Sequence, residues 1–368
     1  MAIMKNYPVP AHAGVLSLKP YVGGASSIKG KERVIKLSSN ECAFGTNPNV
    51  VKACCEQAER LFRYPDGGST ALRMAISETY GLDMNRIVCG NGSDELIGLL
   101  CHAYLGTQDE VIITQYAFLM YRLYAITCGA SPVTVPEKDF KIDLQAVLKI
   151  VDSHTKMIFI TNPGNPTGTY LPLDELSAFC HKLPENILVV IDSAYAEFVD
   201  REDYDAGVAL VNEFPNVVML RTFSKIYGLG GARLGWCYAS QEIADVLNRI
   251  RAPFNVNATA QVAGVAALRD QAFVQSVFKH NKKWLERLPV ELRKIGLVMT
   301  PSVTNFVLVH FPKKSEKSAE QADLFLQSRG IIVRRLVSYG LPDALRITIG
   351  KDEEMEELLS ALKDFMAD

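Results

Sequence analysis

One lysine, flanked by hydroxyl residues and glycines directly after an apolar run, constrains this chain more than any other feature. The run at residues 217–220 predicts a buried strand, and Thr222, Ser224 and Lys225 follow it. A lysine placed there can be desolvated enough to lose its proton, and a neutral amine can form a Schiff base. Arg233, eight positions after the lysine, can hold a phosphate together with the hydroxyls. By itself, the stretch fits a pyridoxal phosphate site and a surface loop with a solvated lysine about equally.

The spacing of this stretch resembles the lysine segment of the fold-type I pyridoxal phosphate aminotransferases, S-K-x-x-x-x-x-G-x-R-x-G. Ser224, Lys225, Gly231, Arg233 and Gly235 fill that pattern. The resemblance extends over nearly the whole chain, and within the superfamily it is greatest to the histidinol-phosphate aminotransferases. It implies pyridoxal 5′-phosphate as cofactor, joined to Lys225. A dinucleotide fingerprint is excluded, because Arg233 stands where G-x-G-x-x-G needs its third glycine.

Length, charge and targeting signals narrow the class of protein. The 368 residues are enough for two domains, and the formal net charge of −2 gives no reason to expect nucleic acid or an anionic membrane. The first residues lack the apolar segment of a secretory signal, and no apolar run reaches membrane-spanning length. Eight cysteines without C-x-x-C spacing and six histidines without ligand-spaced pairs predict reduced thiols and no metal site. We therefore expect a cytoplasmic protein.

Strand and helix patterns alternate from about residue 87 to 240, which predicts a mainly parallel, doubly wound α/β sheet. Ligand-binding residues are then expected at the carboxyl ends of the strands. The resemblance implies an N-terminal arm (1–30), a large cofactor-binding domain (31–252) and a smaller C-terminal α/β domain (253–368). An amphipathic helix is expected over 273–292, with a kink or break at Pro289.

Two strand ends carry candidate cofactor contacts. Asp192 closes the apolar run at 187–191, and a buried carboxylate needs a cationic or hydrogen-bonding partner. A protonated pyridine nitrogen is such a partner, although an aspartate that only caps its strand is also common. After the strand that ends near Gly90, Ser93 is expected to cap a helix, whose free amides at Gly92, Ser93 and Asp94 can bind phosphate.

Other site residues are implied by the resemblance alone. Asn165 and Tyr195 are expected to bond the phenolic oxygen of the cofactor, and Phe118 to stack on its ring. Gly164 and Ser193 depart from the family pattern beside them. Catalysis is assigned to Lys225, Asp192 and Tyr195.

Substrate and subunit contacts are implied in the same way. Tyr21 is expected to cover the active site and Asn40 to bind a substrate carboxylate. Arg334 is expected to meet a substrate phosphate, and Arg346 to hold a carboxylate. Tyr64 is expected to reach the cofactor phosphate of a partner subunit, which implies a homodimer with shared active sites.

The resemblance therefore predicts amino transfer between L-histidinol phosphate and 2-oxoglutarate, two small-molecule substrates, in histidine biosynthesis. Three alternatives stay open at this point. They are an aromatic amino acid aminotransferase, a decarboxylase of a phosphorylated amino acid on the same scaffold, and a non-catalytic regulator with the same fold.

Overall fold

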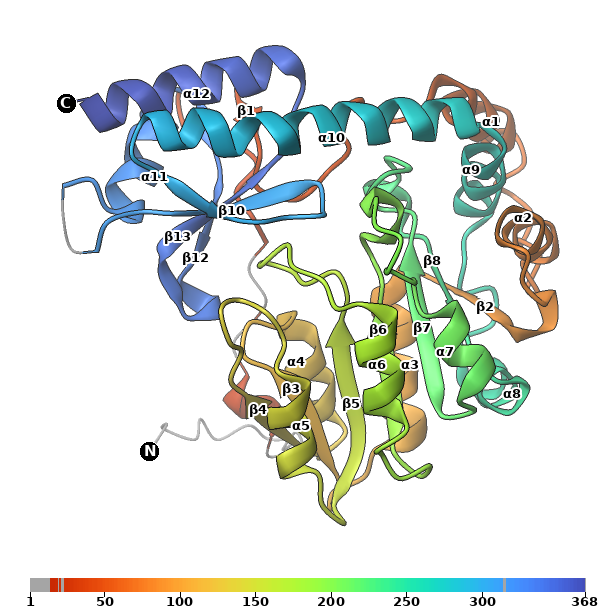
Figure 1. The fold of residues 1–368 in the computed structure, drawn as a ribbon. Helices are drawn as coiled ribbons and strands as arrows, with labels where there is room; N and C mark the ends of the chain where they lie inside the picture. Colours follow the sequence, from red (N-terminus) through yellow and green to blue (C-terminus); the bar gives the residue numbers. More distant parts are fainter. Residues whose placement is uncertain (1–13, 19, 21–22, 314–315, 368) are drawn as a thin grey trace.

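The structure, a computed structural model, describes residues 14–18, 20, 23–313 and 316–367. Its centre is a seven-stranded sheet in the order β2-β8-β7-β6-β5-β3-β4. β8 is antiparallel to both of its neighbours, and the other neighbouring pairs are parallel. The predicted mainly parallel α/β sheet is thus confirmed (Figure 1). The strands are β2 (Ile87–Gly90), β3 (Glu110–Thr114), β4 (Ser131–Val135), β5 (Thr155–Thr161), β6 (Leu188–Asp192), β7 (Val217–Thr222) and β8 (Gly235–Tyr238).

Helices cover both faces of this sheet, which explains the continuous apolar runs of its strands. Every residue of β6 and β7 is buried. One face packs against α3 (Ser93–Tyr104), α4 (Leu119–Thr127) and α8 (Gln241–Ile250). The other packs against α5 (Leu144–Ile150), α6 (Leu173–Cys180) and α7 (Val208–Glu213).

A helical group beyond β2 joins the N-terminal part of the chain to its last third. It contains α1 (Pro48–Ala58), α2 (Thr70–Tyr80) and α9 (Ala258–Arg269), which share the core of the large sheet. From there α10 (Gln271–Lys294) crosses to the C-terminal unit (Figure 1). α10 runs through Pro289, so of the kink or break expected there the break is wrong, and the kink stays a prediction. Leu288 and Leu292 on either side are each 1% exposed, and this packing outweighs the hydrogen bond that the proline removes.

The C-terminal unit is an antiparallel sheet of order β12-β13-β10-β9 with α10, α11 and α12 packed against it. A separate two-stranded parallel pair joins β1 to β11, so Ile35 and Leu37 belong to the C-terminal core. The domain boundaries at residues 31 and 253 stay predictions, since the hydrophobic cores exchange segments at both places. The elements are β1 (Ile35–Lys36), β9 (Val298–Thr300), β10 (Phe306–His310), α11 (Ala319–Ser328), β11 (Ile331–Ile332), β12 (Arg334–Leu336), β13 (Leu341–Thr348) and α12 (Asp352–Ala367).

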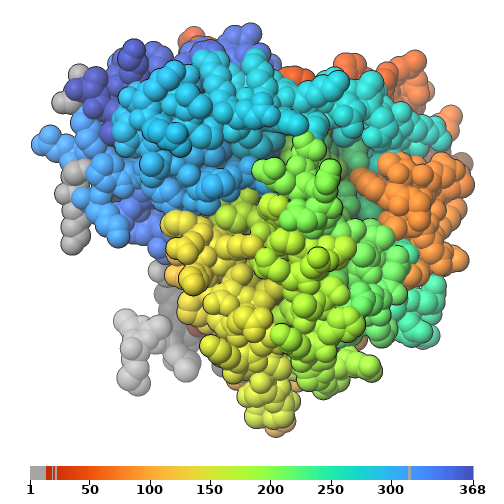
Figure 2. Space-filling model, in the orientation of Figure 1, coloured from red at the N-terminus to blue at the C-terminus, as the bar shows by residue number. Residues whose placement is uncertain are grey.

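Short 3-10 helices complete the chain: η1 (Val15–Ser17), η2 (Met84–Arg86), η3 (Ala196–Phe198), η4 (Gly230–Ala232) and η5 (Val337–Tyr339). The C-terminal unit rests on the upper part of the large sheet, and in Figure 2 its blue surface meets the yellow and green residues of the large unit. Within the described ranges, no helix combines the length and apolarity needed to cross a membrane.

Candidate active site

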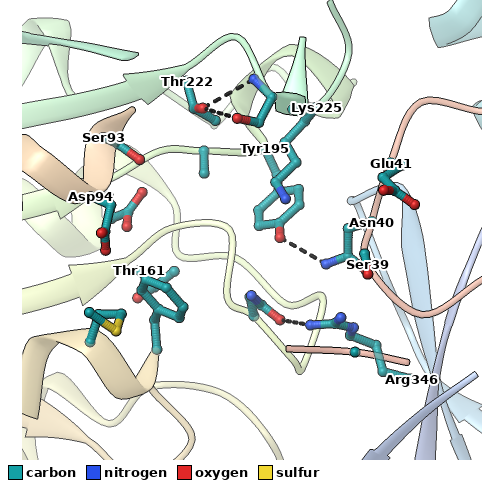
Figure 3. A pocket seen from close by; sticks show the side chains of 18 of the residues that line it. Ser39, Asn40, Glu41, Ser93, Asp94, Thr161, Tyr195, Thr222, Lys225 and Arg346 are labelled. Carbon is teal, nitrogen blue, oxygen red and sulfur yellow. Dashed lines mark hydrogen bonds between the residues drawn. The ribbon is translucent and has the colours of Figure 1, made fainter. Parts of the chain in front are cut away.

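A cavity of about 520 Å³ lies at the carboxyl ends of β5, β6 and β7, where the C-terminal sheet faces them. Most of the predicted site residues line this one cavity, from elements far apart in the sequence (Figure 3). They are Asn40, Ser93, Asp94, Phe118, Asn165, Asp192, Tyr195, Thr222, Ser224, Lys225, Arg233, Arg334 and Arg346.

Lys225 projects into the middle of the cavity from the turn after β7 (Figure 3). Its Nζ lies 5.4 Å from the centre of the Tyr195 ring. Loss of solvent, followed by the positive charges of Arg346 and Arg233, lowers the pKa of Lys225 from 10.5 to about 8. An amine with such a pKa is neutral in a large fraction of molecules near pH 8 and can act as a nucleophile or a base.

Asp192 ends β6, lines the cavity and is 5% exposed. Its Oδ2 accepts a hydrogen bond of 2.6 Å from the Tyr121 hydroxyl, whereas its buried Oδ1 has no hydrogen-bond partner among the described residues. Burial raises the pKa of Asp192, and the Tyr121 hydroxyl opposes that rise. A buried carboxylate oxygen without a partner favours a bound ligand that brings a cation or an N–H group.

An anion-binding corner lies on the β7 side of the cavity. The hydroxyls of Thr222 and Ser224 are 3.0 Å apart, and Arg233 joins them on the cavity wall. The N-terminus of α3, whose first residues are Ser93 and Asp94, opens onto the same cavity. Hydroxyls, a guanidinium and free helix amides together are a typical phosphate site.

The cap of α3 differs from expectation: Gly92, and not Ser93, is the N-cap residue. Gly92 has a φ of 82°, and a Cβ on it would lie 2.6 Å from Arg233 Nη2. The backbone conformation favours glycine there, and a larger residue would have to displace the Arg233 guanidinium. Ser93 is the first helical residue. Gly92 itself shapes the corner without lining the cavity.

Two hydrogen bonds connect the cavity's opposite walls. Arg346 Nη1 donates to Asn165 Oδ1 at 2.7 Å, and Asn40 Nδ2 donates to the Tyr195 hydroxyl at 2.8 Å (Figure 3). The Asn40 Oδ1 also accepts from Thr348, at 3.2 Å. Both ends of the Asn40 amide are therefore bonded, but Nδ2 carries a second N–H, so the substrate-carboxylate role expected for Asn40 stays a prediction.

Phe118 and Arg334 also line the cavity. Phe118 meets Tyr121 edge to face, with ring centres 5.8 Å apart. Arg334 on β12 is paired in register with Arg346 on β13, so two guanidinium groups face one cavity. Arg335, the next residue, instead forms an ion pair with Glu320 at 3.3 Å.

Tyr64, expected to serve the site of a partner subunit, does not line this cavity. Tyr64 is 83% exposed and stacks on Phe254 with ring centres 4.8 Å apart. Its neighbours Leu61 and Phe62 are 62% and 77% exposed, which gives the turn an apolar surface. Tyr21 lies outside the described residues.

Comparison with known proteins identifies the family. The model of aminotransferase class I and II matches residues 32–362. The chain belongs to the class I and II aminotransferases. It is 51% identical over 359 residues to a protein named histidinol-phosphate aminotransferase from Paramagnetospirillum magneticum, covering 98% of this chain and 99% of that one. A protein of the same name from Maricaulis maris is 47% identical, with 97% and 99% covered.

A solved structure of a similar protein agrees with the fold. The histidinol-phosphate aminotransferase of Sinorhizobium meliloti, in complex with pyridoxal 5′-phosphate, is 29% identical and superposes with a TM-score of 0.87 over 97% of both chains. The resemblance noted in the sequence is thus confirmed.

Sequence reasoning about this aminotransferase missed several residues of the cavity. The hydroxyls of Tyr121 and Thr161 bond each other at 3.0 Å, beside Asp192, and Tyr339 also lines the cavity. Tyr121 follows Phe118 by three positions, which puts both near one face of a helix, and that spacing could have indicated it. Thr161 is the last residue of β5, at a strand end where a hydroxyl is easily overlooked.

Proposed function

We propose that this chain transfers the amino group of L-histidinol phosphate to 2-oxoglutarate, giving imidazole-acetol phosphate and glutamate, in histidine biosynthesis. The observation that carries the proposal is one cavity with three parts. A lysine with a pKa of about 8, an anion-binding corner and a buried carboxylate line the same cavity, and one oxygen of that carboxylate has no hydrogen-bond partner among the described residues. The family and the name shared by relatives about 50% identical over the full chain support the same reaction.

The residues present fit pyridoxal 5′-phosphate. Asp192 Oδ1, which has no hydrogen-bond partner among the described residues, would bond the pyridine nitrogen. The phosphate would be held by the anion-binding corner, which consists of Thr222, Ser224, Arg233 and the amides of α3. Phe118 would cover one face of the ring, while Asn165 and Tyr195 would bond its phenolic oxygen. When bound, the cofactor supplies an electron-withdrawing ring next to the substrate's Cα.

Lys225 does the proton chemistry in this proposal. Its amine would hold the cofactor between turnovers, be displaced by the substrate amine, and then be free as a base. It would remove the proton from the substrate's Cα and return it at the cofactor's C4′ carbon. Asp192 would keep the ring nitrogen protonated by remaining ionised beside it.

Two arginines would receive the substrates. Arg334 would bind the phosphate of histidinol phosphate, and Arg346 the carboxylate of the amino acid and oxo acid partners. Arg346 already has its guanidinium plane fixed by bonds to Asn165 Oδ1 and Ser38 O, each 2.7 Å. A planar, fixed guanidinium suits bidentate recognition.

The subunit arrangement is also a proposal. A homodimer would cover the exposed surface of Leu61, Phe62 and Tyr64, with Tyr64 reaching the phosphate of the partner's cofactor. Tyr21 would close the cavity. The enzyme would work in the cytoplasm.

The test is to incubate the purified protein with pyridoxal phosphate, L-histidinol phosphate and 2-oxoglutarate and to follow glutamate. Glutamate should form with the wild-type protein and not with Lys225→Ala. Release of carbon dioxide from a phosphorylated amino acid, without glutamate, would favour a decarboxylase. No reaction, despite bound cofactor, would favour a non-catalytic role.

A further inference from the structure

Asn40 is held rigidly from the side of the C-terminal unit. It is 1% exposed, and its φ of 55° lies in the left-handed region, which asparagine tolerates better than most residues. Its backbone N–H donates to Thr348 Oγ1 at 2.9 Å, and its carbonyl accepts from Asn305 Nδ2 at 3.0 Å. Both partners lie more than 260 positions away along the chain.

The orientation of the Asn40 amide follows from Thr348. The threonine hydroxyl accepts the Asn40 backbone N–H, and its own proton then needs an acceptor. Asn40 Oδ1, 3.2 Å away, is that acceptor. The opposite orientation would leave the threonine proton without this partner. The Nδ2 group is therefore the one that faces Tyr195, at 2.8 Å.

This contact decides what Tyr195 can do with its single proton. An amide N–H only donates, so the Tyr195 oxygen accepts from Asn40 and keeps its own proton for another group. The ring of Tyr195 is 2% exposed and packs edge-on to Phe306 with ring centres 5.1 Å apart. Tyr195 lines the cavity, so the remaining proton of its hydroxyl can be donated to a ligand bound there, and Lys225 Nζ lies over the face of its ring, 5.4 Å from the ring centre (Figure 3). A phenol that accepts one hydrogen bond is also a stronger donor in the next.

We propose that Asn40 is a positioning residue: by donating to Tyr195, it aims the tyrosine proton at the phenolic oxygen of the cofactor and so tunes the protonation of the nitrogen of Lys225. The inference rests on the proposed function, which puts that oxygen in the cavity. A hydrogen bond to the phenolic oxygen partly neutralises its charge, so the neighbouring Lys225 nitrogen loses its proton at lower pH. Without Asn40, Tyr195 donates more weakly, and the Lys225 nitrogen keeps its proton to higher pH.

The test uses the cofactor-loaded protein and the pH midpoint of its visible absorption band. Asn40→Gly removes the amide and accommodates the φ of 55° without strain. The midpoint should rise by about half a pH unit or more, as expected for one lost hydrogen bond. Tyr195→Phe should raise it further, and adding Asn40→Gly to Tyr195→Phe should change nothing more, because Asn40 acts only through the tyrosine hydroxyl.

A second pair of variants, at Thr348, tests the same inference if Asn40→Gly fails to fold. Thr348→Val removes the hydroxyl that orients the amide and should raise the midpoint in the same direction, although residue 348 is not bonded to Tyr195. Thr348→Ser keeps the hydroxyl and should leave the midpoint unchanged. An unmoved midpoint in Asn40→Gly and Thr348→Val, or additive shifts in the double variant, would overturn the inference. A wild-type protein that shows no pH-dependent band with pyridoxal phosphate would overturn the proposed function instead.

Discussion

Arg346 Nη1 donates a hydrogen bond to Asn165 Oδ1 across the cavity, over 2.7 Å and 181 positions of sequence. The bond joins β13 of the C-terminal sheet to the loop that follows β5. The guanidinium is buried and passes over the ring of Phe306 at 5.4 Å. An arginine fixed in one plane at the wall of a cavity gives an incoming carboxylate one geometry in which to bind.

The lowered pKa of Lys225 predicts a distinctive pH dependence. In cofactor-free protein the amine is protonated below its pKa of about 8 and neutral above it, whereas an ordinary lysine changes near 10.5. The rate at which a small amine-reactive reagent modifies Lys225 should therefore rise with pH and level off above about 8. Peptide mass spectrometry, with exposed lysines of the same protein as controls, measures this. A rate at Lys225 that keeps rising to pH 10 in step with those lysines would contradict the desolvated environment.

Asp192→Asn should retain cofactor but slow proton transfer, because a neutral amide cannot hold the pyridine nitrogen protonated. We expect a loss of roughly 100-fold or more in the rate of the half-reaction, the size typical of one lost preorganised electrostatic partner. Rapid-mixing absorbance measures that step. Tyr121→Phe is the matched control, since it removes the hydrogen bond to Asp192 and keeps the carboxylate. A rate within a few-fold of wild type in Asp192→Asn would mean that Asp192 only caps its strand.

Arg334→Ala should cut kcat/KM for histidinol phosphate by roughly 30-fold or more. Leaving a buried phosphate without its cation costs on the order of 2–5 kcal/mol, and about 1.4 kcal/mol corresponds to tenfold. Phenylalanine has no distal charge and should lose much less. Arg335→Ala is the control, because Arg335 pairs with Glu320. Equal losses for both substrates would make Arg334 a structural residue or a carboxylate clamp.

A mixture of Tyr64→Ala and Lys225→Ala chains tests the shared active site. If Tyr64 acts across the dimer, each mixed dimer has one site with both lesions and one with neither. Random exchange should then restore about a quarter of wild-type activity from two nearly inactive proteins. Each variant incubated alone is the control. Activity that stays at the sum of the separate variants, or a protein that sediments as a monomer, would rule the arrangement out.

The sheet and most of the cavity were predictable because their signals are local. Apolar runs that end in Asp192 or lead to Thr222 mark parallel strands, and such strands bring their carboxyl ends together. Arg346 lies in an apolar stretch of β13, and a buried arginine of this kind requires partners, here Asn165 and Ser38. The other site residues could be predicted only from the resemblance to the family.

Other features depend on contacts that no local pattern contains. Asn40 bonds Tyr195 and Thr348, which lie 155 and 308 positions away. Arg221 follows an apolar run yet is buried beside Glu197 at 2.7 Å. The glycine cap of α3 lies against Arg233, a contact between residues that are distant in the sequence. Each of these needs the tertiary structure before its role can be stated.

The most direct test of the account is a comparison of kcat/KM for L-histidinol phosphate, L-phenylalanine and L-tyrosine, each with 2-oxoglutarate, on the wild-type protein. The account predicts that histidinol phosphate is preferred by roughly 30-fold or more, the equivalent of about 2 kcal/mol from a phosphate–guanidinium contact. Equal values, or a preference for either aromatic amino acid, would contradict it and identify the chain as an aromatic amino acid aminotransferase.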